Sequence, residues 1–290
     1  MDLVRKIARA VLYDGYLLWP NGRAAALKDQ QRGTAGGILP EPYARAHEGD
    51  AWLAQTQCLL LADPVDTVAV HVRFLQLVTC DLARFSDGRL EPVPELVVGG
   101  ARHVARQEAR EREAAVTGLD LAELLRRPAV MDVDILADQQ AEWLGESGVR
   151  LLGWEELRGR VEIQAERLRR GVFRLTVKVM NTTRWQGDTR AEAMKRGLIS
   201  AHTVLSTDGG RFVSLIDPPD DLRRLAAGCH NVGTWPVLVG EEGERHTMLS
   251  APIILYDYPR SPAELFDAAE IDRFLTLSTL AHGEREQQES

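Results

Sequence analysis

The sequence is poor in cysteine and contains no paired cysteine motif. Its 290 residues include three cysteines, Cys58, Cys80 and Cys229, which are far apart and form no Cys-x-x-Cys. An odd number of widely spaced cysteines excludes a disulfide framework and gives no support to a zinc ribbon or a thioredoxin motif. We therefore expect the thiols to be reduced.

Long apolar runs and phosphate-binding glycine loops are also missing. The first twenty residues contain only short apolar runs broken by charge and glycine, which fits neither a secretory signal nor a membrane span. The pairs Gly36-Gly37, Gly99-Gly100 and Gly209-Gly210 lack the neighbours and spacing of a nucleotide-binding loop. These absences predict a cytoplasmic protein and give no support to a kinase or a dehydrogenase.

The chain has no excess of positive charge. It carries 35 Lys and Arg against 43 Asp and Glu, a formal net charge of -8, and its pI is near 5.5. A general nucleic-acid binder needs a basic face that displaces counterions from phosphates, so we expect no nucleic-acid partner. With 44% hydrophobic residues, the chain can bury the core of one large domain or of two ordinary ones.

What the sequence does contain is apolar residues at alternate positions. This pattern covers residues 160–183, on both sides of Gly171, and residues 66–85, and it predicts antiparallel strands with one buried face. Residues 201–219 predict a third hairpin with its turn at Asp208-Gly209-Gly210. The expected fold class is α+β and β-dominated: an antiparallel sandwich or barrel-like core over about residues 155–260, with a few peripheral helices.

Helix signals are fewer and lie mainly in the second half. Thr189 and Glu192 have the spacing of a capping box, and Gly197 follows where a left-handed helix stop is expected. Pro262, after Ser261, predicts the start of a C-terminal helix. Short helices are also expected within 120–127 and 219–228, whereas residues 106–116 fit either an exposed helix or an edge strand.

These signals divide the chain into three parts. Residues 1–150 are expected to form an N-terminal β-rich region with an extended aromatic arm, because the opening is rich in proline, glycine and aromatics but has little periodicity. Residues 151–280 are expected to form a C-terminal antiparallel β region closed by a helix. The polar residues 281–290 are expected to be a disordered tail.

The adjacent Cys229 and His230 are the most conspicuous candidates for chemistry. Neighbouring residues of an extended segment point to opposite faces, so His230 is badly placed to activate Cys229 as a nucleophile. A transition metal such as zinc or iron could bind the set Cys229, His230, His202 and His246, although no short ligand spacing exists. The alternative, which we favour, is a structural corner without a cofactor, where the chain turns into a buried strand.

Aromatic residues outside the periodic segments are candidates for protein binding. Tyr16 and Trp19 lie in the opening segment, Trp185 follows a polar turn, and Trp235 follows the Cys-His pair. Aromatic side chains at loop tips are enriched in interfaces and carry much of the binding energy there. They predict a protein partner.

Several segments together resemble a family of uncharacterised proteins that are encoded beside actinobacterial-type, oxygen-tolerant nickel-iron hydrogenases. The similar segments are residues 11–20, 26–33, 201–219, 229–260 and 261–277. The resemblance implies a non-enzymatic accessory, assembly or maturation role, with a hydrogenase subunit or its precursor as the partner. The rival hypothesis is a metal-binding protein or metalloenzyme that uses the Cys/His set.

Overall fold

The protein is described by a computed structural model that covers residues 2–17, 37–86 and 88–259. Strands dominate it, and the helices are short apart from the first. The helices are α1 (Asp2–Leu17), α2 (Glu41–Ala46), α3 (Leu121–Leu124), α4 (Arg190–Lys195) and α5 (Arg223–Ala227). The predicted β-dominated α+β class, with antiparallel sheets and peripheral helices, is confirmed.

Two antiparallel sheets face each other, and a separate hairpin completes the strand set. The first sheet runs β15 (Trp235–Leu238), β16 (Thr247–Ala251), β13 (Leu198–Asp208), β3 (Thr67–Ser86), β10 (Gly148–Trp154), β9 (Asp138–Leu144), with β1 (Gly37–Ile38) on β13 and with β4 (Arg89–Val93) and β7 (Arg106–Asp120) on β3. The second runs β14 (Arg211–Val213), β2 (Leu53–Leu61), β12 (Val172–Asn181), β11 (Leu157–Arg169), β8 (Ala129–Ile135). The hairpin is β5 (Glu95–Val98) with β6 (Ala101–Val104).

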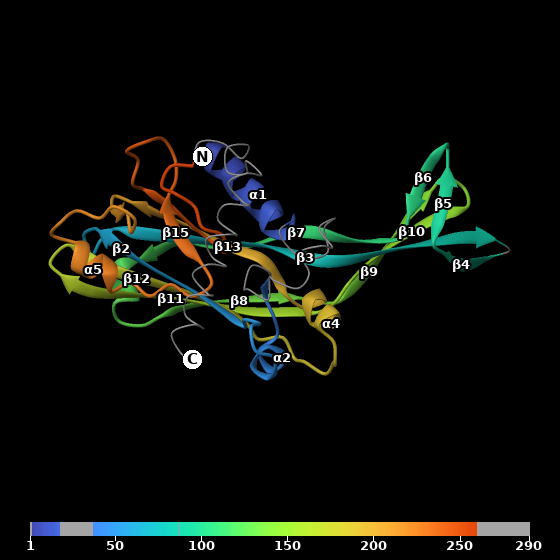
Figure 1. Cartoon of the computed structure of the whole chain (residues 1–290), viewed down its shortest axis with the longest axis horizontal. Helices are drawn as coiled ribbons and strands as arrows, with labels where there is room; N and C mark the ends of the chain where they lie inside the picture. The colour runs from blue at the N-terminus through green and yellow to red at the C-terminus, as the bar shows by residue number, and fades with distance from the viewer. Residues whose placement is uncertain (1, 18–36, 87, 260–290) are drawn as a thin grey trace, which may run out of the picture.

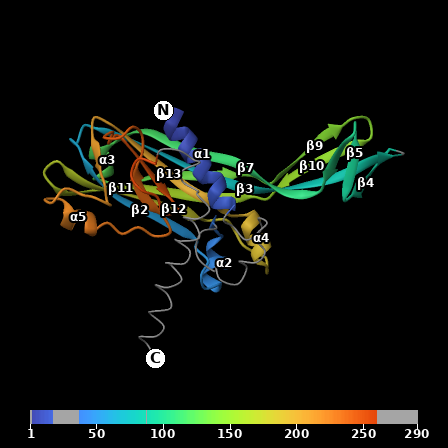
Figure 2. The same ribbon diagram turned by 45° about the horizontal axis from the view of Figure 1, so that its top comes forward.

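Strand β3 belongs to two parts of the molecule. Its first half pairs with β13 on one side and β7 on the other, inside the sandwich. Its second half pairs with β10 and β4 and leaves the sandwich. Figures 1 and 2 show this second half, with β4, β5, β6, β9 and β10, projecting from the body as a long arm. We call these strands the β-arm.

The sandwich core forms because alternate residues of facing strands are apolar. From β3 the core takes Val68, Val70, Val72 and Phe74, and from the second sheet it takes residues such as Ile163. All five are almost completely buried. Strands β2, β3 and β7 come from the first half of the chain, so the core is not confined to residues 155–260, and the expected division near residue 150 does not separate the sheets.

The predicted hairpin around Gly171 and the predicted capping box are confirmed. β11 and β12 pair over their length, and Gly171 has a φ of +71°, in the left-handed region that suits glycine. Thr189 accepts from the Glu192 backbone, and the Glu192 side chain accepts in return from the Thr189 backbone. The undecided residues 106–116 are strand, as part of β7.

The third predicted hairpin is wrong. β13 pairs with β3 and β16, and therefore neither of its edges is open to the following strand β14. β14 instead pairs with β2 in the second sheet, with Phe212 opposite Leu60. The turn at Asp208-Gly209-Gly210 thus carries the chain from one sheet to the other, and Gly209 has a φ of +98° there.

The sequence predicted a left-handed conformation for Gly197, and this prediction is wrong: the φ of Gly197 is not positive. Its role is close packing instead. A Cβ at this position would lie 2.9 Å from Leu39 Cδ2 and 3.0 Å from Ile199 Cδ1. The missing side chain lets the end of α4 approach the buried cluster around Leu39.

The opening of the chain is helical as far as residue 17, so Tyr16 does not lie in an extended arm. Ile7, Ala8 and Val11 recur at helical spacing and are buried against Val237 and Leu249 of the first sheet. Burial of this apolar stripe stabilises α1. Trp19, the predicted C-terminal helix and residues 281–290 lie outside the described residues.

In the part of the chain that the structure describes, no helix combines the length and the apolar character that crossing a membrane requires.

Candidate functional site

The segment Gly228–Val232, which contains Cys229 and His230, is a strap fixed to the second sheet by hydrogen bonds. Gln57 accepts from the His230 backbone N–H through its side-chain oxygen at 2.8 Å, and the Gln55 side-chain amide donates to the His230 carbonyl at 2.9 Å. Asn231 accepts from the Gln57 backbone, and Arg174 donates to the Gly228 carbonyl. Every partner belongs to β2 or β12. The strap therefore leads the chain from α5 to the buried strand β15.

The thiol of Cys229 is not set up as a nucleophile. It packs against the cluster around Leu59 and Leu222, and this burial raises its pKa to about 11, with the charge of Arg174 acting in the opposite direction. The Cys58 thiol is completely buried, and its pKa is also raised, first by burial and then by the nearby Cys229. A reactive cysteine needs a lowered pKa and an accessible sulfur, and neither thiol has both.

The four predicted metal ligands do not form a cluster. His202 is buried in the middle of β13, its Nδ1 lies 3.3 Å from the Ser200 carbonyl, and the pKa of the ring is lowered to about 4, chiefly by burial. His246 lies just before β16, and its carbonyl accepts from the Thr207 backbone. Within residues 2–17, 37–86 and 88–259, no three histidine, cysteine, aspartate or glutamate side chains gather where they could hold a metal ion.

The aromatic candidates lie in different surroundings. Trp185 is partly buried, with its ring in edge contact with Tyr43 at 5.3 Å between centroids. Trp235 is 40% exposed on β15, at the end of the first sheet. Tyr16 lies in α1, and Trp19 lies outside the described residues. Of the two candidate tryptophans whose side chains the structure describes, Trp235 has an exposed ring, whereas Trp185 packs in the cluster with Tyr43.

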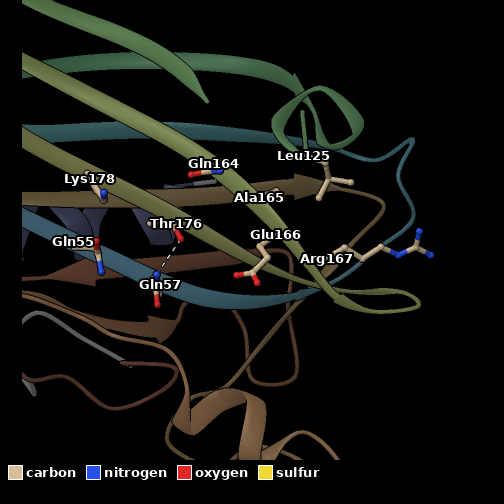
Figure 3. A pocket seen from close by; sticks show the side chains of 9 residues that line it. All are labelled: Gln55, Gln57, Leu125, Gln164, Ala165, Glu166, Arg167, Thr176 and Lys178. Carbon is tan, nitrogen blue, oxygen red and sulfur yellow. Dashed lines mark hydrogen bonds between the residues drawn. The ribbon is translucent and has the colours of Figure 1, made fainter. Parts of the chain in front are cut away.

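A polar trough of about 600 Å³ lies on the second sheet (Figure 3). Gln164, Thr176 and Gln57 stand opposite one another on β11, β12 and β2, and the Gln57 amide donates to the Thr176 hydroxyl at 3.2 Å. The complete lining is Gln55, Gln57, Leu125, Gln164, Ala165, Glu166, Arg167, Thr176 and Lys178. Two of these glutamines also hold the strap, so the strap and the trough share residues.

One side of the trough lies where β8 no longer pairs with β11. β8 pairs with β11 only from Leu157 to Ile163, because β8 begins at Ala129 after Pro128, which has no N–H to donate. Beyond Ile163, no strand among the described residues pairs with β11 on that side, and the helix α3 packs against β11 instead. Residues 164–167 line the trough consecutively.

A smaller cavity of about 230 Å³ lies where the β-arm leaves the body, beside Trp154. The guanidinium groups of Arg110 and Arg112 lie over the Trp154 ring, at 4.6 and 5.4 Å from its centroid. Arg112 also donates to buried Gln76, and Gln76 donates to the Glu155 carbonyl. The network ties β3, β7 and the end of β10 together, although Nη2 of Arg112 is buried without a hydrogen-bond partner among the described residues.

The β-arm has a small buried core and, in addition, several apolar side chains that are exposed to solvent. Ala83, Leu96 and Val149 are buried there. Phe85 and Trp143 meet edge to face at 5.4 Å yet remain 38% and 57% exposed. Further exposed apolar residues of the β-arm are Leu90, Val97 and Val104. The sequence reasoning missed this surface because its residues alternate like those of any half-buried strand.

Comparison of the chain with protein-family models and with curated proteins finds no match.

Proposed function

We propose that the protein is a non-enzymatic accessory factor that holds a protein partner during assembly or maturation of a nickel-iron hydrogenase, in the cytoplasm. The observation that carries the proposal is the β-arm. It projects from the body (Figure 1). It presents Phe85 and Trp143 to solvent as an aromatic pair. Exposed aromatics on a projecting element are typical of binding surfaces.

The chemistry of the other candidate residues agrees with a binding role. The Cys229 thiol has a raised pKa, and the Gln57 amide groups are engaged in holding the strap and Thr176. Neither arrangement activates a nucleophile. The hydrogenase partner is supported by the sequence resemblance, which implies a subunit or its precursor.

The test uses the full-length protein and the purified large-subunit precursor of an oxygen-tolerant nickel-iron hydrogenase. We expect binding by isothermal titration calorimetry. The double variant Phe85→Ser, Trp143→Ser should weaken it about a hundred-fold, because central aromatics contribute about 1.4 kcal/mol or more each. Val65→Ser is the matched control, since Val65 is 81% exposed and precedes the opposite end of β3.

Circular dichroism and the urea midpoint establish that each variant is folded. Equal affinity of the wild-type protein and the double variant would exclude the β-arm as the binding surface. If the wild-type protein binds neither the precursor nor the mature subunit, this partner is excluded.

A further inference from the structure

We propose that Arg110 and Arg112 of β7, which lie against the ring of Trp154, form a binding site for a carboxylate group. The site lies where the β-arm leaves the sandwich (Figure 1). It shares no residue with the exposed apolar set of the β-arm, so this proposal and the proposed function can fail independently. The carboxylate belongs either to an acidic side chain of a partner protein or to a small organic acid, and experiment can separate these two sources.

The two arginines reach the ring from the same side. They are two residues apart on one strand, so their side chains lie on the same face of the first sheet. β3 is paired with β7 on one side and with β10, which ends in Trp154, on the other. Both side chains therefore cross β3 from β7, and their guanidinium carbons lie 4.6 and 5.4 Å from the centroid of the ring.

Neutral groups hold the two guanidinium groups in place. Nε of Arg112 donates to the side-chain oxygen of the buried Gln76 at 3.0 Å. Nη2 of Arg110 lies 3.4 Å from the side-chain oxygen of Gln140 on β9. These acceptors are amides, so they orient the guanidinium groups but do not neutralise their charge. Because the groups are already ordered, binding of a ligand has little further side-chain entropy to lose.

The charge of this pair has no counter-ion, and this distinguishes it from comparable arginines. The arginines that are partly buried within the described chain are Arg73, Arg110, Arg112, Arg150, Arg174 and Arg196. Carboxylates pair with all of them except Arg110 and Arg112. The pKa of Arg112 is lowered first by burial and then by the charge of Arg110. A partly buried charge without a counter-ion is unfavourable, so a ligand that supplies a carboxylate is stabilised here.

Hydrogen-bond donors of the pair remain available to a ligand. Nη2 of Arg112 is buried and has no partner among the described residues. The other unpartnered nitrogens, which are Nη1 of Arg112 and both Nε and Nη1 of Arg110, are not buried. A guanidinium group stacked on a ring presents its edge to solvent, and this edge can donate two parallel hydrogen bonds to a planar carboxylate.

A neighbouring acid favours a carboxylate over a phosphate. Asp138 of β9 stands opposite Trp154 in the register of β9 and β10, and it has no ion-pair partner among the described residues. The two arginines and this aspartate together carry a single net positive charge, which one carboxylate neutralises. Repulsion from Asp138 is stronger for a phosphate dianion than for a singly charged carboxylate.

The experiment follows the indole N–H of Trp154 by NMR in the full-length, nitrogen-15-labelled protein. This N–H donates to the Leu136 carbonyl at 3.1 Å, and the variant Trp154→Phe identifies its signal. The probes are acetylated, amidated Gly-Glu-Gly and propionate, which carries the same carboxylate without the peptide. We expect a saturable shift of the signal with both, and none with Gly-Gln-Gly at the same concentration. Tighter binding of the peptide assigns the site to an acidic side chain, and tighter binding of propionate assigns it to a small acid. Inorganic phosphate should bind more weakly than both, and tighter binding of phosphate would overturn the assignment to a carboxylate.

Three variants separate a binding role from a structural one. Arg110→Gln and Arg112→Gln should each weaken binding about ten-fold or more, because each removes charged hydrogen bonds. Arg110→Gln should leave the urea midpoint unchanged or raise it, because it removes a repelling charge. Arg211→Gln is the matched control and should leave binding unchanged, since Arg211 is exposed and has no carboxylate partner among the described residues. A lowered midpoint of Arg110→Gln with unchanged binding would show that the pair is structural, and equal weakening by Arg211→Gln would show unspecific attraction. Either result overturns the site.

Discussion

Replacing the buried His202 by leucine should make folding stability less dependent on pH. His202 is 2% exposed, and a carbonyl can only accept, so the contact of its Nδ1 with the Ser200 carbonyl places the proton of the neutral ring on Nδ1. A second proton must then bind Nε2, which is buried and has no hydrogen-bond partner within the described residues. The imidazolium is therefore strongly disfavoured in the folded protein.

The sign and size of the effect follow from the pKa values. Burial lowers the pKa of His202 from 6.5 to about 4, with the carbonyl of Ser200 opposing the shift and Arg73 adding to it. The unfolded chain takes up a proton below pH 6.5 that the folded protein refuses until about pH 4. The stabilisation is thus complete above pH 6.5 and is lost as the pH falls toward 4, by about 2 kcal/mol at pH 5 and about 3 kcal/mol at pH 4.

The assay is urea unfolding of wild type and His202→Leu at pH 7.5, 5 and 4, followed by circular dichroism. Other groups also titrate in this range, so the informative quantity is the change with pH of the difference between the two proteins. The exposed His230 provides the control variant His230→Leu, which should follow the wild-type dependence. If the stability curves of wild type and His202→Leu run parallel from pH 7.5 to 4, the buried-imidazole reasoning is refuted.

Two further predictions concern packing and thiol chemistry. Gly197→Ala should destabilise the protein by about 1–3 kcal/mol, because its Cβ would meet Leu39 and Ile199 at 3.0 Å or less, and an unchanged urea midpoint would contradict this. At pH 8, Cys229 of the native protein should react with iodoacetamide about ten-fold more slowly than Cys229 of the urea-unfolded chain. The raised pKa lowers the fraction of thiolate roughly a hundred-fold. A thiolate of higher pKa is a stronger nucleophile, which restores only part of this loss. Mass spectrometry of the alkylated peptides measures both rates, and equal rates would show that the sulfur is not buried as described.

The fold class was predictable from sequence where the pattern is local. The hairpin about Gly171 and the capping box at Thr189 depend on residues close to one another in the chain, and both are confirmed. The pairing of β14 was not predictable, because its partner β2 is far away in sequence and the apolar pattern is the same for any partner. The helix α1 was missed because its buried stripe, around Ile7 and Val11, is short.

The candidate sites were less accessible to sequence reasoning than the fold. The polar residues of the trough follow period two, which is a visible signal. That they meet on one face depends on the pairing of β2, β12 and β11, which the pattern does not reveal. The exposure of Phe85 and Trp143 depends on β3 continuing beyond the second sheet, and nothing in an alternating pattern reveals where a covering layer ends.

The shared strand β3 has a mechanical consequence. It is 20 residues long, about 63 Å end to end, and runs without interruption from the body into the β-arm. Cross-strand hydrogen bonds flank β3 along almost this whole length. The β-arm is therefore a rigid extension of the first sheet and not a domain joined by a flexible linker. A partner bound at the tip of the β-arm is therefore held at a fixed distance and orientation relative to the sandwich, and the length of β3 sets that distance.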